Sequence, residues 1–193
     1  MKKKFPDSHR GHFLIAESNM SDPNFFQTVV LILEHNEEGA FGLVVNRKSQ
    51  LTLGDLMPGF QNEKGYAIPV YVGGPVQQEY LFALHSEIEG IEQSPSAIKP
   101  VDGVVFEPAF MILENYLKEH EEKEGTIHLF LGYSGWAPGQ LESEMERGSW
   151  MTLPAKPNIV FHPNPEEGWR AALREKGGIY KVFADSNQDP ALN

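Results

Sequence analysis

The segment from Leu129 to Met145, "LFLGYSGWAPGQLESEM", holds the residues whose types and spacing come nearest to a catalytic motif. Ser134 lies two residues after Gly132, as the nucleophile does in the Gly-x-Ser-x-Gly turn of α/β-hydrolases. That turn also needs a small residue two positions after the serine, because its backbone is strained. Trp136 stands there, and Pro138 follows it. The motif of a serine nucleophile is therefore incomplete.

Two other interpretations of this segment remain open. A glycine-rich turn before a helix can present backbone N–H groups to a phosphate or carboxylate. No Gly-Lys-Ser/Thr follows, however, and Glu142, Glu144 and Glu146 add negative charge. In the structural interpretation the glycines supply unusual backbone angles while Tyr133 and Trp136 fill the core. We favour the structural interpretation, and expect the segment to form a wall of any pocket nearby.

Two further turns follow expected strands. Asn46-Arg47 leaves an apolar run, and its guanidinium can bind a carboxylate bidentately, although an internal salt bridge is the simpler expectation. Gly73-Gly74-Pro75 predicts a tight turn, which faces a ligand only if another loop meets it. The candidate ligand-binding residues are Asn46, Arg47, Gly73, Gly74, Pro75, Gly132, Tyr133, Ser134, Gly135, Trp136 and Gln140.

The residues that commonly bind metals show no metal-site spacing. The chain has no cysteine, which excludes disulfides, thiolate metal sites and a cysteine nucleophile, and fits a reducing compartment. His120-Glu121 lacks the second histidine of a His-Glu-x-x-His zinc motif. His85, at the end of a strand, is expected to be satisfied internally. We therefore assign no catalytic residue, no metal ligand and no cofactor.

The formal net charge of −11 bears on the partners of the protein. Acidic residues are concentrated between Glu79 and Glu124, where the only basic residues are Lys99, Lys118 and Lys123. Nucleic-acid binding depends mainly on Lys and Arg neutralising phosphates, so direct nucleic-acid binding is disfavoured. A solvated acidic face is the simplest explanation, and a basic protein partner is compatible with it.

We expect no signal peptide at the first residues. Three lysines within Met1–Phe5 are followed at once by Pro6, Asp7, His9 and Arg10, where an apolar region is required. No apolar stretch approaches the roughly 18 residues of a membrane-spanning helix. We expect a soluble cytoplasmic protein without membrane contact.

The length of 193 residues predicts one domain, at 11–183, with a flexible N-terminus at 1–10 and a loose tail at 184–193. A hairpin is expected from 28–33 and 40–45, and 68–76 and 80–86 are expected to be neighbouring strands. Further extended segments are expected at 11–17, 103–107, 126–133 and 149–155, and helices at 51–57, from Pro108, at 138–147 and from Pro165 to Gly177-Gly178. Strands outnumber helices without alternating with them, which predicts an α+β fold.

Three segments in order resemble the YqgE/AlgH family of bacterial proteins. They are "GHFLIAESNMSDPNFFQTVVLILEHNEEGAFGLVVNR" at 11–47, "VYVGGPV" at 70–76 and "LFLGYSGWAPGQLESEMERGSWM" at 129–151. The resemblance extends to about Lys181, and implies a compact α+β domain with a mixed or antiparallel branched β-sheet, a small barrel-like portion and flanking helices. It implies no catalytic residue or cofactor. Some members are described as transcriptional regulators, a role that this acidic chain without a helix-turn-helix pattern would exert indirectly.

Two hypotheses follow. The first is a non-enzymatic binding or indirect transcription-regulatory module with a protein partner. The second is a small-molecule-binding protein or enzyme whose pocket lies where Asn46-Arg47, Gly73-Gly74-Pro75 and Gly132–Gln140 converge. The sequence does not indicate the oligomeric state.

Overall fold

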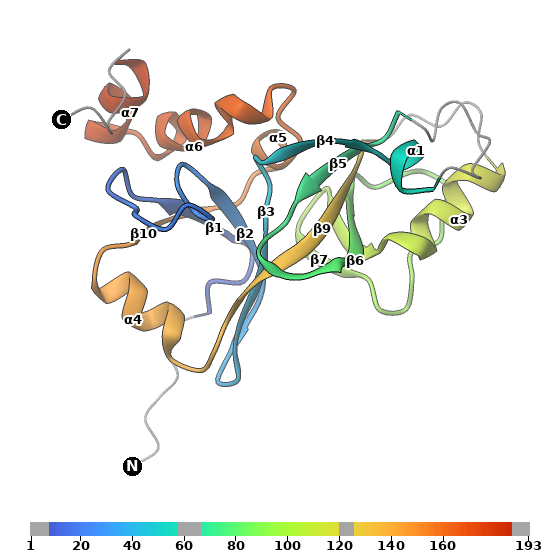
Figure 1. The fold of residues 1–193 in the computed structure, drawn as a ribbon, viewed down its shortest axis with the longest axis horizontal. Coiled ribbons are helices and arrows are strands. Elements are labelled where there is room, and N and C mark those ends of the chain that lie inside the picture. Colours follow the sequence, from blue (N-terminus) through green and yellow to red (C-terminus); the bar gives the residue numbers. More distant parts are fainter. Residues whose placement is uncertain (1–7, 58–66, 120–125, 187–193) are drawn as a thin grey trace.

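The computed structural model describes residues 8–57, 67–119 and 126–186. Its strands are β1 (His12–Ala16), β2 (Val29–Asn36), β3 (Gly39–Val44), β4 (Lys48–Thr52), β5 (Pro69–Val72), β6 (Val76–His85), β7 (Ile98–Val101), β8 (Val104–Pro108), β9 (Ile127–Trp136) and β10 (Trp150–Pro154). Its helices are α1 (Leu53–Leu56), α3 (Ala109–Glu119), α4 (Gln140–Glu146), α5 (Pro157–Val160), the 3₁₀ turn η1 (Pro165–Glu167), α6 (Gly168–Lys176) and α7 (Gly178–Asp185). Figure 1 shows the helices on the periphery of the strands.

The strands form one ten-stranded sheet that branches at β9. The main path is β10-β1-β2-β3-β9-β6-β8-β7, and β4 joins β5, which joins β9. The β5–β9 pairing is parallel and the other pairings are antiparallel. Over the described residues the sheet does not close into a barrel. The α+β fold with a branched sheet is thus confirmed. Where a barrel-like portion was expected, the structure has the open branch of β4 and β5.

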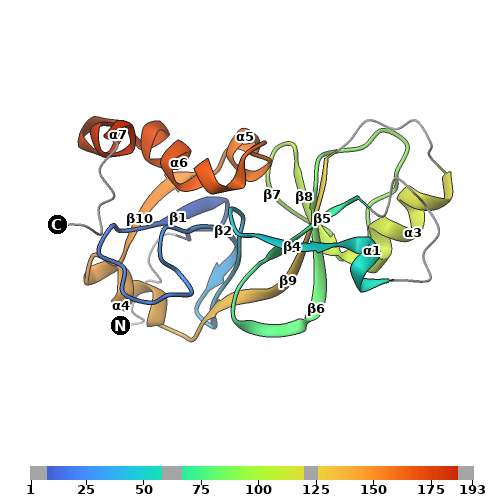
Figure 2. The ribbon, with the colours of Figure 1, turned by 45° about the horizontal axis from the view of Figure 1, so that its top comes forward.

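The apolar runs of β1 and β2 are buried on both faces. Phe13 and Ile15 belong to the core beneath α5, α6 and α7, whereas Leu14 and Ala16 belong to the core beside α4. The residues of β2 alternate in the same way. Figure 2 shows α5, α6 and α7 along one side of these strands. Two-sided burial explains why these strands read as continuous apolar runs without alternation.

A third core lies in the half of the molecule that contains α1 and α3 (Figure 1). Ile112 and Leu113 of α3 share this core with β-strand residues that include Val70 and Leu129, and α3 itself lies against β6 and β8. Helix α1 begins with a capping box in which the Thr52 backbone N–H donates to the Asp55 carboxylate at 2.8 Å. These contacts fix the N-terminal half of β9 between β5 and β6.

Several expected elements differ from the structure. The segment "GYSGW" is not a turn, because β9 continues to Trp136 and pairs with β3 as far as Ala40. The segments 68–76 and 80–86 are not paired neighbours, since β9 lies between β5 and β6. Strands β4 and β7 and helix α5 were not expected, and α7 begins where Gly177-Gly178 was expected to end the last helix.

The domain limits remain a prediction. The Ser8 hydroxyl donates to the His35 carbonyl at 2.9 Å, and the His9 N–H donates to His35 Nδ1 at 3.1 Å, so the described fold begins before residue 11. At the other end α7 runs to Asp185 with Ala184 buried. The expectations for residues 1–7, 187–193 and His120-Glu121 fall outside the described residues.

Candidate functional site

The Gly73-Gly74-Pro75 turn crosses closely over β9 at Gly132 and Tyr133, where the chain passes from β5 on one side of β9 to β6 on the other. The Gly73 N–H donates to the Leu131 carbonyl, and the Gly73 carbonyl accepts the Val44 N–H. A Cβ on Gly132, whose φ is +67°, would lie 2.7 Å from the Gly74 carbonyl oxygen. A Cβ on Gly74 would lie 2.2 Å from the Tyr133 carbonyl group. These positions need glycine because two backbones approach too closely for a side chain.

Ser134 takes part in this crossing as a buried side chain. It is 0% exposed, and its hydroxyl donates to the Gly73 carbonyl at 3.1 Å. A nucleophile must reach its substrate, whereas this hydroxyl joins β9 to the Gly73 turn. The incomplete hydrolase motif therefore corresponds to a structural serine.

Asn46 and Arg47 lie close to the crossing through their backbone, because the Val72 N–H donates to the Arg47 carbonyl at 2.9 Å. Their side chains point to a different loop. The Asn46 amide accepts from the Val29 N–H at 2.8 Å and donates to the Gln27 carbonyl at 2.9 Å. The Arg47 guanidinium donates to the carbonyls of Asn24, Pro23 and Phe26. Burial lowers the pKa of Arg47, and the Asp22 carboxylate partly opposes this effect.

Trp136 and Gln140 are tied to Glu144 of α4. The indole N–H groups of Trp136 and Trp150 both donate to Glu144 Oε2 at 2.9 Å, and the Gln140 amide donates to Glu144 Oε1 at 2.9 Å. Phe25 packs against both indoles. One carboxylate thus joins α4 to the ends of β9 and β10. Gln140 also accepts the Ala137 N–H, so its amide is used internally.

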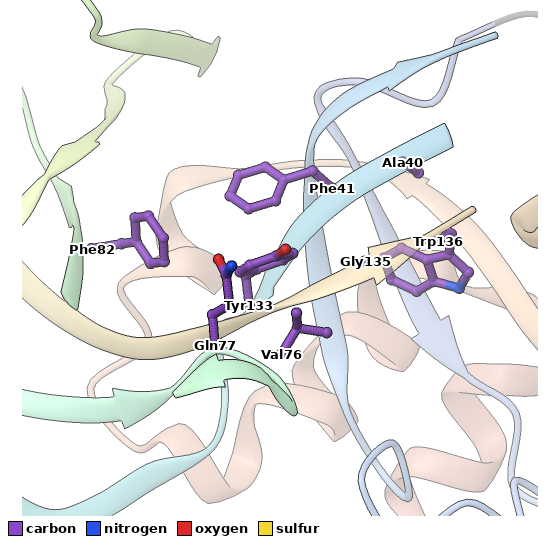
Figure 3. A pocket seen from close by; sticks show the side chains of 8 residues that line it. All are labelled: Ala40, Phe41, Val76, Gln77, Phe82, Tyr133, Gly135 and Trp136. Atoms are coloured by element: carbon purple, nitrogen blue, oxygen red, sulfur yellow. The ribbon is translucent and has the colours of Figure 1, made fainter. Parts of the chain in front are cut away.

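A pocket opens next to the crossing, on the side that Tyr133 faces. Its volume is about 590 Å³, within the range of small-molecule sites. Figure 3 shows the residues that line it, which are Ala40, Phe41, Val76, Gln77, Phe82, Tyr133, Gly135 and Trp136. Of the candidate residues, Tyr133, Gly135 and Trp136 therefore contribute to its wall, whereas Gly73, Gly74 and Gly132 do not line it.

Three aromatic rings from three strands form much of this wall. The rings of Phe41 and Tyr133 lie 4.9 Å apart between centroids, those of Phe41 and Phe82 6.1 Å, and those of Phe82 and Tyr133 6.3 Å. Their partners in register are Gly135 for Phe41 and Val76 for Tyr133. Gly135 has no side chain, and a Cβ there would lie 3.1 Å from the Tyr133 ring, so this glycine leaves room in front of the rings.

The polar groups of the pocket come from Gln77 and Tyr133. Four residues of β6 loop out between the pairs Val76–Tyr133 and Leu81–Leu131, and Gln77 begins this bulge with a φ of +48°. A residue with a side chain is rarely held there, at a cost of about 1 kcal/mol or more, and such strain is common at binding sites. Neither the Gln77 amide nor the Tyr133 hydroxyl has a hydrogen-bond partner among the described residues. Figure 3 shows the Gln77 amide beside the Tyr133 ring.

His85 is satisfied internally, as expected. Its Nδ1 donates to the Ser86 carbonyl at 2.7 Å, and its Nε2 lies 2.8 Å from the Glu107 carboxylate, which is 0% exposed. The second oxygen of Glu107 accepts the Ser94 N–H. Glu107 thus joins His85 to the acidic loop that follows β6.

His128, on β9, is the one histidine with an unsatisfied buried atom in the described parts of the chain, Nδ1. Its ring stacks on Tyr71 at 4.6 Å and meets the edge of Phe161 at 5.3 Å. Burial, assisted by the charge of Lys48, lowers the pKa of His128 to about 4. Burial also raises the pKa of Tyr71 to about 12. Both rings are therefore neutral at pH 7.

Two features are absent from the described residues. No group of three or more His, Asp or Glu side chains in them is arranged to hold a metal ion. Nor do they include a helix that is long and apolar enough to cross a membrane.

Sequence reasoning missed five lining residues: Ala40, Phe41, Val76, Gln77 and Phe82. Phe41 stands between glycine and alanine in a strand expected to be buried, and Gln77 lies between two expected strands. A weak signal exists in the polar stretch Gln77-Gln78-Glu79, which interrupts an apolar run and marks the bulge. The register that brings these residues to Tyr133 is not visible in the sequence.

Comparison with known proteins gives one consistent result. A family model described as AlgH-like matches residues 13–181. The chain is 35% identical to a UPF0301 protein of Chlorobium limicola, over all of both chains. It is 34% identical to a UPF0301 protein of Streptomyces coelicolor, over 95% of this chain and 94% of the relative.

Two solved structures have a similar fold. The solution structure of the AlgH protein from Pseudomonas aeruginosa is 36% identical in sequence, with a TM-score of 0.69 over 97% of this chain and 100% of that chain. A crystal structure of a Corynebacterium diphtheriae protein has a TM-score of 0.75 over 96% and 95% of the two chains. At 24% identity the second likeness concerns the fold alone.

Proposed function

Since the chain belongs to the AlgH-like family, a family of uncharacterised function, we propose its function from its own pocket. The protein is a non-enzymatic binding module that holds an apolar or aromatic group of a small organic molecule beside Phe41, Phe82 and Tyr133. A regulatory effect on transcription, on this proposal, follows from the bound ligand and not from contact with DNA. A cytoplasmic location belongs to the same proposal and is supported by the absence of cysteine from the sequence.

The observation that carries the proposal is the aromatic pocket itself. Binding sites for small molecules are mostly apolar and aromatic, with a few polar groups that orient the ligand. Here three rings supply the apolar wall, and Gln77 and Tyr133 supply the polar groups. The burial of Ser134 and the internal hydrogen bonds of Asn46 and Arg47 support binding over catalysis.

The test is protein-observed NMR titration with 2-phenylethanol, a neutral aromatic probe, on the wild-type protein and on Gly135→Val. Gly135 has an ordinary strand conformation, so the backbone accepts valine. The valine Cβ would lie 3.1 Å from the Tyr133 ring, so the added side chain crowds this ring and narrows the space beside it. We expect the wild-type shifts to map to the pocket and Gly135→Val to weaken binding by about tenfold or more.

Ser134→Ala and Arg47→Ala serve as matched controls. Both remove polar groups that are engaged within the protein, so they should lower stability while leaving the affinity for the probe unchanged. Equal affinity of wild type and Gly135→Val, or shifts that map away from the pocket, would refute the proposed function.

A further inference from the structure

The lining of the pocket favours positively charged over negatively charged groups. Among the described residues that line it, none carries a positive charge. The acceptors that face it are the Tyr133 hydroxyl and the carbonyl of the Gln77 amide. Aromatic rings carry partial negative charge on their faces, so the rings of Phe41, Phe82 and Tyr133 attract cations.

A carboxylate stands beside this wall. Glu34 of β2 is directly opposite Phe41 of β3, and Phe41 is directly opposite Gly135 of β9. Side chains opposite one another in antiparallel strands project from the same face of the sheet. Glu34, Phe41 and the empty position of Gly135 therefore form one row across three strands. Glu34 is exposed. It is the outer member of this row, and the other two members, Phe41 and Gly135, line the pocket.

A second acid lies in the bulge that bounds the pocket. Glu79 is exposed and follows Gln77 by two residues in the segment that loops out of β6. With a net charge of −11, the whole chain adds a negative potential around these two carboxylates. An anionic ligand would therefore be repelled by hydrogen-bond acceptors, aromatic faces and nearby carboxylates. No positively charged side chain of the lining would offset this repulsion.

We infer that the group entering the Phe41–Phe82–Tyr133 pocket is a nitrogen cation that carries N–H donors, a primary ammonium or a guanidinium. This inference rests on the proposed function and specifies the ligand of the same site. The cation lies against the aromatic wall, donates to Gln77 and Tyr133, and is drawn in by Glu34. It belongs either to a free amine or to a lysine or arginine side chain of a basic polypeptide.

The test compares three probes of similar size on the wild-type protein: 2-phenylethylamine, which is cationic, 2-phenylethanol, which is neutral, and 3-phenylpropanoate, which is anionic. Affinities are measured by NMR titration at low and at physiological salt. We expect the amine to bind roughly tenfold more tightly than the alcohol, and the anion to bind least. Raising the salt should weaken only the amine.

The matched variants are Glu34→Gln and Glu37→Gln. Both remove one exposed carboxylate from the same hairpin, but Glu37 lies in the turn and not opposite Phe41. Glu34→Gln should weaken the amine severalfold without changing the alcohol, and Glu37→Gln should change neither. An acetylated Ala-Arg-Ala peptide as a fourth probe separates the sources: tighter binding than the amine favours a polypeptide, and weaker binding a free amine.

The outcomes separate this inference from the proposal beneath it. If the alcohol binds in the pocket as tightly as the amine, or if Glu34→Gln leaves the amine unaffected, the cation inference is wrong and the binding module stands. If no probe binds at the pocket in the wild-type protein, both fail.

Discussion

At the scale of single residues, His128 shows how burial changes the chemistry of a side chain. The ring is held between Tyr71 and Phe161, and its Nδ1 has no partner within the described residues. Burial lowers the pKa of His128 from 6.5 to about 4, so the folded protein resists a proton that the unfolded chain accepts. The sign of the pH effect follows directly.

The stability should therefore fall as the pH is lowered from 6.5 towards 4, and this group should add no pH dependence above 6.5. At pH 5 the loss is roughly 2 kcal/mol, since each pH unit below the ordinary pKa costs about 1.4 kcal/mol. Urea unfolding at pH 7 and pH 5 measures it. His128→Phe keeps a ring against Tyr71 and removes the titration, so its stability should change less with pH. If the unfolding free energy of both proteins fell equally between pH 7 and pH 5, His128 would not be the source of the pH dependence.

The polar side chains of Ser134, Asn46 and Arg47 serve the fold itself. Their residue types suggested chemistry or ligand binding, but their polar atoms satisfy backbone groups of distant segments. Their partners, such as Gly73, Val29 and Asn24, are defined only by the tertiary fold. A polar residue after a strand is equally compatible with a ligand and with a structural hydrogen bond, so the sequence alone could not decide between them.

At the scale of elements, α4 is fixed to the sheet through Glu144. Its carboxylate accepts from the indoles of Trp136 on β9 and Trp150 on β10, and from Gln140 within the helix. These strands lie at different places in the sheet, with β1, β2 and β3 between them. Glu144 therefore holds together parts of the molecule that no strand pairing joins.

Glu144→Leu should destabilise the protein by about 2 to 4 kcal/mol, because it leaves two buried indole N–H groups without an acceptor. Chemical unfolding measures the loss, and tryptophan emission reports the altered surroundings of Trp136 and Trp150. Glu146→Leu is the matched control, since Glu146 is exposed on the same helix. A similar small loss of stability for both variants would show that the hydrogen bonds of Glu144 to the two indoles contribute little.

The elements also show what the sequence predicts well. Runs such as "TVVLIL" and the helix after Pro108 are specified locally, and the hairpin of β2 and β3, α1, α4 and β8 were predicted near their observed limits. The path of β9 was not. Gly132 interrupts the strand with a φ of +67°, and pairing with β3 restores it up to Trp136. Such long-range pairing overrides the turn propensity of "GYSGW".

The same limit applies to the pocket. Tyr133, Gly135 and Trp136 were among the candidates, but Phe41 and Gln77 come from strands whose register is fixed only in the folded sheet. A shift of one residue in that register would turn Phe41 to the opposite face. The assignment of a ligand to these residues stays a prediction until binding is measured.

At the scale of the whole molecule, the charge of −11 governs long-range behaviour. A duplex binds proteins largely through phosphates that Lys and Arg neutralise, with release of counterions. The acids of this chain outnumber its basic residues, with 27 Asp and Glu against 16 Lys and Arg. The protein as a whole should repel DNA.

We expect no saturable binding of a fluorescently labelled DNA duplex at physiological salt, measured by fluorescence anisotropy up to micromolar protein. A small basic DNA-binding protein is the positive control. Saturation that weakens as salt increases would identify a local basic surface and overturn the expectation.

The position of β1 has a consequence for synthesis on the ribosome. β1 (His12–Ala16) lies between β2 and β10 (Trp150–Pro154). One of the first strands to be synthesised therefore lacks one of its two partners until β10 is made. Until β10 leaves the exit tunnel, one edge of β1 exposes backbone groups that can pair with another chain. The native sheet is thus completed only near the end of translation, and slower synthesis would lengthen the time for which that edge can pair with another chain.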